Sequence, residues 1–147
     1  MHSKLLRFVI LLMISWSSAA ADLVFVVNIN NKSEFTQAQL MQLYLRKTES
    51  FSDGVAANLY HLPRNSAEHQ HFCMSILNLT ANQYQSFWSR LLFTGNVSAM
   101  EHRDNSQMLL QIQSDKAGIG YLPLSADHAG VRAVAILRDR QLEILVP

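Results

Sequence analysis

The stretch from Leu62 to Glu68 has the residue types and order that best suit the binding of a ligand. The apolar run before it favours a β-strand, Pro63 ends that strand, and the polar residues that follow are typical of a helix start. A strand that leads directly into a helix leaves free backbone N–H groups at the positive end of the helix dipole, where anions bind. The candidate oxyanion-binding residues are Arg64, Asn65, Ser66 and Ala67.

The same turn has a second interpretation, which is ordinary helix capping. The helix can begin at Asn65 or at Ser66, and Asn65 with Glu68 has the N-x-x-E spacing of a capping box. A capping box would satisfy the free N–H groups within the helix, without a ligand. The local sequence favours capping over ligand binding, and both interpretations stay open at this point.

Histidines are the next candidates for chemistry, because His69 and His71 lie close together in the sequence. Two ligands on one helix share a metal ion at spacings of three or four residues. At a spacing of two, the side chains point about 200° apart, so they cannot reach one ion. We therefore expect no metal site and predict that these histidines lie on a solvated helix surface.

The chain has none of the usual catalytic arrangements. Its single cysteine, Cys73, shares an apolar helix face with Phe72 and Ile76, which predicts a small buried side chain rather than a nucleophile. The sequence contains no G-x-S-x-G turn, paired catalytic carboxylates or glycine-rich nucleotide loop. Residues 101–104, which include His102, read as a polar loop. We predict a protein that is not an enzyme and needs no cofactor.

The elements that must position these residues follow from hydrophobic periodicity and capping signals. Strands are predicted at 23–29, 55–62, 119–123, 131–137 and 142–146. Helices are predicted to begin at Thr36, at Ser66, at Thr80, and at Asn105 or Ser106. This order predicts a single α/β domain, with a small mixed sheet covered by helices in a three-layer-like arrangement.

The helix patterns also predict which side chains are buried. The expected core positions are Leu40, Leu43 and Tyr44 in the first helix, Tyr84, Phe87, Trp88, Leu91 and Leu92 in the third, and Leu109 and Ile112 in the fourth. The aromatic residues of the third helix have helical spacing, which favours core packing over a stacking platform for sugars or bases. Gly120 is expected to allow a close approach of the backbone.

Residues 1–21 have the features of a secretory signal peptide, with Lys4 and Arg7 before an apolar core and a small-residue cleavage site. The apolar run is too short for a membrane span, so we expect a periplasmic domain of residues 22–147 without stable membrane insertion.

Without Lys4 and Arg7 the chain has 10 basic and 11 acidic residues. This near-neutral balance argues against nucleic acid and anionic membranes as partners.

Several segments, in order, resemble phosphate-type periplasmic solute-binding proteins. Val26-Val27-Asn28 and the segment from Thr36 to Lys47 resemble their "VVN … LT..QL..I(F/Y)LGK" pattern. Ser66 resembles their serine-rich anion turn, and the later similar segments are Phe87-Trp88-Ser89-Arg90 and Ala117-Gly118-Ile119-Gly120-Tyr121. The resemblance implies a short, single-lobe form of a type II binding-protein fold.

The family's anion turn is roughly Arg-x-Asp-Gly-Ser-Gly-Thr, and this chain keeps only part of it. Ser66 matches the serine, Ala67 and Glu68 replace the glycine and threonine, and Leu62 falls at the arginine. Arg64 is a neighbouring substitute for that arginine. The resemblance thus implies a domain that binds phosphate or another oxyanion weakly at a helix N-terminus. The alternative is a ligand-free protein-interaction module with a partner in a cell-envelope assembly.

Overall fold

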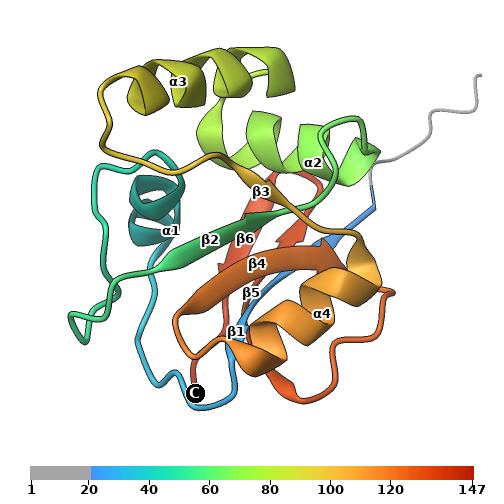
Figure 1. The fold of residues 1–147 in the computed structure, drawn as a ribbon. Coiled ribbons are helices and arrows are strands. Elements are labelled where there is room, and N and C mark those ends of the chain that lie inside the picture. Colours follow the sequence, from blue (N-terminus) through green and yellow to red (C-terminus); the bar gives the residue numbers. More distant parts are fainter. Residues whose placement is uncertain (1–20) are drawn as a thin grey trace, which may run out of the picture.

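The computed structural model describes residues 21–147 (Figure 1). The predicted signal peptide, residues 1–21, lies outside the described residues apart from its last residue. Within the described part of the chain, no helix is both long enough and apolar enough to cross a membrane.

A six-stranded mixed sheet forms the centre of the domain, in the order β3-β2-β4-β1-β5-β6. The strands are β1 (Leu23–Asn28), β2 (Asn58–His61), β3 (Glu101–His102), β4 (Gly118–Pro123), β5 (Val131–Arg138) and β6 (Gln141–Ile144). β1 is antiparallel to both β4 and β5, and β6 is antiparallel to β5. β2 is parallel to β3 and β4. The predicted mixed sheet and its closing hairpin are confirmed.

β1 lies between two neighbours and is covered on both faces, as its continuous apolar sequence predicts. All six of its residues are buried. Leu23 pairs with Pro123 of β4 on one side and with Leu137 of β5 on the other. Each backbone edge of β1 therefore has a partner strand, and the strand forms the middle of the core.

Helices cover both faces of the sheet. They are α1 (Gln37–Tyr44), α2 (Ala67–Phe72), the π-helical turn η1 (Cys73–Leu77), α3 (Ala81–Phe93) and α4 (Asn105–Ser114). α4 packs on β4 and β1. Phe25 of β1 contacts Tyr44 of α1 and Phe72 of α2, which places these two helices together on one face. Figure 1 shows α3 outside α2, further from the sheet.

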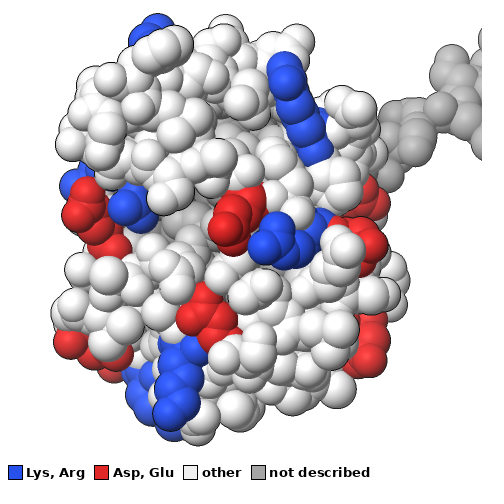
Figure 2. Space-filling view, viewed as in Figure 1, with Lys and Arg blue, Asp and Glu red and all other residues white. Residues whose placement is uncertain are grey.

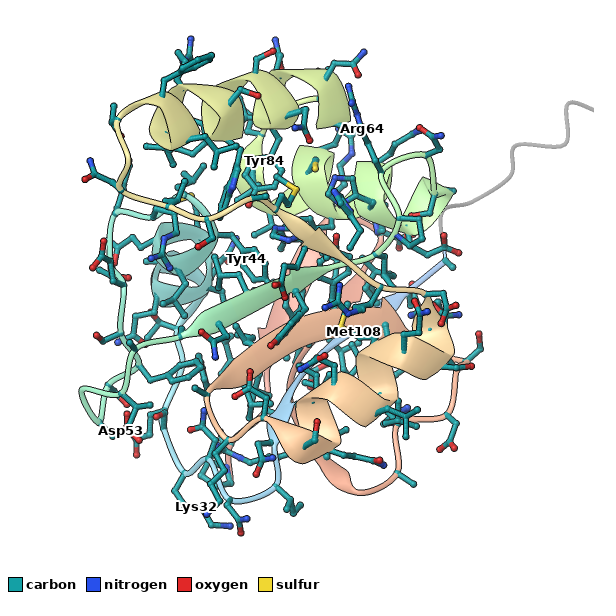
Figure 3. All side chains as sticks on the ribbon, in the orientation of Figure 1. Lys32, Tyr44, Asp53, Arg64, Tyr84 and Met108 are labelled. Carbon is teal, nitrogen blue, oxygen red and sulfur yellow. The ribbon has the colours of Figure 1, made fainter. Side chains whose placement is uncertain are left out.

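Successive residues of β4 face different helical layers. Tyr121 stacks on Phe72 with ring centroids 4.3 Å apart, so it faces the side of the sheet that carries α2. The next residue back, Gly120, faces α4, because successive side chains of a strand point to opposite faces. A Cβ at Gly120 would lie 2.3 Å from Sδ of Met108 (Figure 3). The predicted close approach at Gly120 is confirmed, and it brings α4 against the sheet.

The predicted helix starts at Thr36 and Thr80 are confirmed, each with its complete capping box. The expected core residues of α1, which are Leu40, Leu43 and Tyr44, are all buried.

Several details differ from the sequence prediction. Three residues that were expected in the core are only half-buried; they are Phe87, Leu91 and Leu109. The cap of α4 is Asp104, one residue before the predicted positions. Leu92 is 38% exposed rather than buried. Glu101 and His102 form β3 beside β2 instead of a polar loop.

Candidate functional site

The turn between β2 and α2 is closed by the hydroxyl of Ser66. The His69 N–H donates to Ser66 Oγ at 3.1 Å, and the Ser66 hydroxyl donates to the Pro63 carbonyl at 2.6 Å. Ser66 is therefore the N-cap of α2. The capping box expected between Asn65 and Glu68 does not form, because the helix begins one residue later than that pairing needs.

The start of α4 faces the start of α2 across a shared hollow of about 340 Å³. We call it the two-helix hollow; it is lined by Leu62, Pro63, Ser66, Glu68, Asp104, Asn105 and Ser106. Asp104 caps α4 by accepting from the Gln107 N–H at 2.8 Å. The first N–H groups of a helix have no acceptor within that helix. The positive ends of two helices thus meet at one hollow.

The pairing of β2 with β3 holds the two helix starts together. The Arg103 N–H donates to the His61 carbonyl at 2.8 Å, and His102 Nδ1–H donates to the Leu62 carbonyl, also at 2.8 Å. These two bonds place Asp104, the residue that follows, beside the turn that leads into α2.

The structure brings only part of the predicted site together. Ser66 lines the two-helix hollow, whereas Asn65 and Ala67 are exposed and do not line it. Arg64 lies toward α3 (Figure 3), where its Nη2 donates to Asn82 Oδ1 at 3.3 Å. The guanidinium that was expected to replace the family's arginine is thus engaged elsewhere.

Sequence reasoning missed the contribution of Asp104, Asn105 and Ser106 to this site. The sequence did indicate a helix start at these residues, but the two-residue strand that carries it to Ser66 has no pattern of its own. Glu68 and Asp104 both line the two-helix hollow, so the negative charges of two carboxylates offset part of the positive potential of the helix ends there. Figure 2 shows Lys/Arg and Asp/Glu side chains in small mixed groups on this face, rather than in one basic patch.

A buried polar cluster lies directly behind the turn and corrects the prediction for His69. His69 is 1% exposed and His61 is fully buried, so neither is a solvated surface histidine. His69 Nδ1 lies 2.5 Å from Tyr121 Oη, and this hydroxyl also accepts from the Leu62 N–H at 3.3 Å. His69 points inward because it lies three residues before Phe72, on the same buried face of α2.

His61 is held by a second tyrosine, Tyr84. The Tyr84 hydroxyl donates to the Tyr44 carbonyl at 2.8 Å, so it accepts from His61 Nε2–H at 3.0 Å. This assigns the proton of His61 to Nε2. In residues 21–147, its Nδ1 finds no hydrogen-bond partner.

Burial keeps this cluster uncharged at neutral pH. It lowers the pKa of His69 to about 4, with the neighbouring His102 as a further cause, and it lowers the pKa of His61 well below 6.5.

Burial also raises the pKa of the Cys73 thiol to about 12, so this buried side chain is not a reactive thiolate. No set of three or more His, Cys, Asp or Glu residues in the described range is arranged to hold a metal ion.

Comparison with solved structures finds the same fold in phosphate receptors. An ABC-type phosphate transport receptor from Vibrio cholerae aligns over 78% of this chain and 46% of its own, with a TM-score of 0.59 and 15% identity. A putative phosphate ABC transporter substrate-binding protein from Clostridium perfringens, solved with bound phosphate, aligns over 78% and 45%, with a TM-score of 0.57 and 13% identity. PstS from Borrelia burgdorferi aligns over 71% and 42%, with a TM-score of 0.54 and 15% identity.

Comparisons of sequence do not assign the chain to a family: no family model and no curated protein matches it. The chain spans less than half the length of each of these three receptors. These neighbours are transport substrate-binding proteins rather than enzymes. The chain has a phosphate-binding-protein-like fold that matches one lobe of such a receptor.

Proposed function

We propose that this protein is an exported, periplasmic, non-enzymatic domain that binds phosphate or another oxyanion weakly at the start of α2. The observation that carries the proposal is the meeting of the α2 and α4 N-termini at the two-helix hollow. Backbone N–H groups and helix dipoles that converge on one hollow favour an anion. The phosphate-binding-protein-like fold supports the same ligand class.

The ligand would contact Ser66 and the N–H groups of the adjacent first turn, including that of Ala67. Asn65 and Arg64 lie on the same turn, and a change of side-chain rotamer could bring either toward the anion. In the geometry described, Arg64 bonds to Asn82 and the Ser66 hydroxyl donates to Pro63. Each of these bonds competes with the ligand, so we expect a dissociation constant of about 1 mM or weaker.

Calorimetric titration of phosphate and sulfate into the wild-type protein and into Ser66→Ala tests the proposal. The expected result is millimolar binding to the wild type that weakens in the variant. Thr80→Ala is the matched control, because it removes the cap of α3 and does not touch the two-helix hollow. The absence of any saturable heat with either anion up to tens of millimolar would rule out the ligand.

A ligand-free interaction module of an envelope assembly is the second candidate. The carboxylates of Glu68 and Asp104 in the two-helix hollow favour it, because they repel an anion. Crosslinking in native envelopes followed by mass spectrometry distinguishes the two functions. A reproducible protein partner, together with a silent phosphate titration, would select the module.

A further inference from the structure

A second hollow lies at the opposite end of β2 from the two-helix hollow. It measures about 290 Å³, and we call it the Arg46 cavity. Its lining residues are Arg46, Ala57, Asn58, Leu59, Tyr60, Trp88, Val97, Ser98, Ala99 and Glu101. The two hollows have no lining residue in common. The Arg46 cavity is therefore a separate place from the one proposed for the oxyanion.

Arg46 occupies this cavity in an unusual way. Its backbone is left-handed, with φ of 56°. A non-glycine residue is strained in this conformation. The chain thus keeps a long basic side chain where a glycine would be easier to accommodate.

The guanidinium of Arg46 is largely buried and incompletely bonded. Its side chain is 17% exposed, and its Nε is a buried donor that lacks a hydrogen-bond partner anywhere in residues 21–147. The nearest carboxylate oxygen, Oε1 of Glu49, lies 3.9 Å from Nη2, beyond hydrogen-bond distance. An unpaired buried donor on a charged group is costly, and an acceptor that a ligand supplied to the terminal Nη groups would offset part of the cost of burying this charge.

The walls of the Arg46 cavity are mostly polar, with a smaller apolar part. Trp88 Nε1–H donates to the Ser98 carbonyl at 2.9 Å, which holds the 97–99 loop across from β2. Apolar side chains on both sides offer contacts for carbon atoms; they are Ala57, Leu59, Val97 and Ala99.

We propose that the Arg46 cavity binds a small organic carboxylate. The two Nη atoms of a guanidinium match the two oxygens of a carboxylate, and Nη2 of Arg46 has no carboxylate oxygen within hydrogen-bond distance in residues 21–147. The short carbon body of the ligand would lie against the apolar walls. Glu101 at the rim is 3.4 Å from Arg103, which offsets part of its negative charge.

Titration of succinate, pyruvate and L-glutamate, followed by two-dimensional NMR of the ¹⁵N-labelled protein, tests this inference. At least one of the three should bind saturably and shift the amide signals of Leu59 and of residues 97–99. Arg46→Gly should weaken that binding by about tenfold or more, because the charge-assisted bonds are lost. Glycine adopts a positive φ freely, so this variant is expected to fold.

Two controls separate the cavity from other causes. Arg90→Ala removes one positive charge from α3 outside the cavity, and Ser66→Ala alters only the two-helix hollow. Both should bind the carboxylate as the wild type does. The inference is overturned if none of the three carboxylates binds, if binding persists unchanged in Arg46→Gly, or if phosphate binds at Arg46 in place of the carboxylates.

Discussion

Tyr121 Oη and His69 Nδ1 lie 2.5 Å apart and join the middle of the sheet to the start of α2. The same hydroxyl accepts from the backbone N–H of Leu62. One phenol group thus fixes both the end of β2 and the first turn of the helix that follows. The geometry of the turn at residues 62–68 depends on this contact as well as on the cap at Ser66.

Removal of this hydroxyl is expected to destabilise the fold. Tyr121→Phe leaves the buried His69 Nδ1 and the Leu62 N–H without their partner, which should lower the free energy of unfolding by about 1–3 kcal/mol. Urea denaturation followed by circular dichroism measures the change. Tyr60→Phe is the control, because its partners Asp115 and Gln111 are both partly exposed and can bond to water instead. Equal losses in the two variants would contradict the role given to Tyr121.

Stability should fall as the solution is acidified below pH 6.5. An unfolded histidine binds a proton near pH 6.5, whereas folded His69 does so only near pH 4, so between these values the unfolded state holds more protons. The free energy of unfolding should then decrease toward low pH by about 1.4 kcal/mol per pH unit for this histidine. Buried His61, whose pKa is also lowered, adds to the effect.

Urea denaturation at pH 7, 6 and 5 measures this dependence. His69→Gln removes one of the two groups, so its stability should change less steeply with pH than that of the wild type. The two proteins are compared by the slope of the free energy of unfolding against pH, since the stability of the variant at pH 7 is expected to differ as well. Equal slopes for wild type and variant would show that His69 does not stay neutral in the folded state.

A methyl group at Gly120 should not fit beside α4. Gly120→Ala places a Cβ against Met108 Sδ in a fully buried region, and we expect a loss of about 1–3 kcal/mol from overpacking. In a Met108→Ala background the same substitution should be much less harmful, because the opposing side chain is gone. A thermodynamic cycle of the four proteins measures this coupling. Additive effects would contradict the close contact.

Neutralising a carboxylate in the two-helix hollow should strengthen oxyanion binding. Glu68→Gln removes a negative charge next to the proposed anion, and we expect affinity for phosphate to rise by about fivefold at low salt. Glu49→Gln changes the net charge equally, but Glu49 does not line this hollow, so it serves as control. Calorimetry with phosphate compares the two. A similar gain in both would indicate a general charge effect instead of a site.

Relief of the strained backbone at Arg46 should stabilise the domain in the absence of ligand. Arg46→Gly allows the left-handed conformation without a Cβ clash, so the free energy of unfolding should rise by up to about 1 kcal/mol. Lys47→Gly, one residue along and not in that conformation, should lower stability instead. Thermal unfolding of the two variants provides the comparison. A loss of stability in Arg46→Gly would mean that the side chain contributes more by packing than the backbone loses by strain.

Local signals predicted the helix starts of this fold well. Thr36 with Gln39 and Thr80 with Gln83 form the expected capping boxes, because the partners lie three residues apart and need nothing from the rest of the chain. The buried strand β1 was also predictable, since only burial on both faces suits so continuous an apolar run.

Features that depend on distant residues were not predictable. His69 is buried because Tyr121, far along the chain, supplies its hydrogen-bond partner. Ser66 faces Asp104 because two residues of β3 pair with β2, and so short a strand leaves no periodic signal. The candidate site was therefore recognised as a turn, while its second half and the direction of Arg64 required the tertiary structure.

The central place of β1 in the sheet has a consequence for the order in which the protein can fold. β1 is made first, but both of its partner strands come from the last third of the chain, and the second of them ends at Arg138. During synthesis the most apolar strand therefore waits for almost the whole chain before its backbone can pair. Such long-range pairing is slow to form. The core of the domain can therefore form only after nearly all of its strands are available.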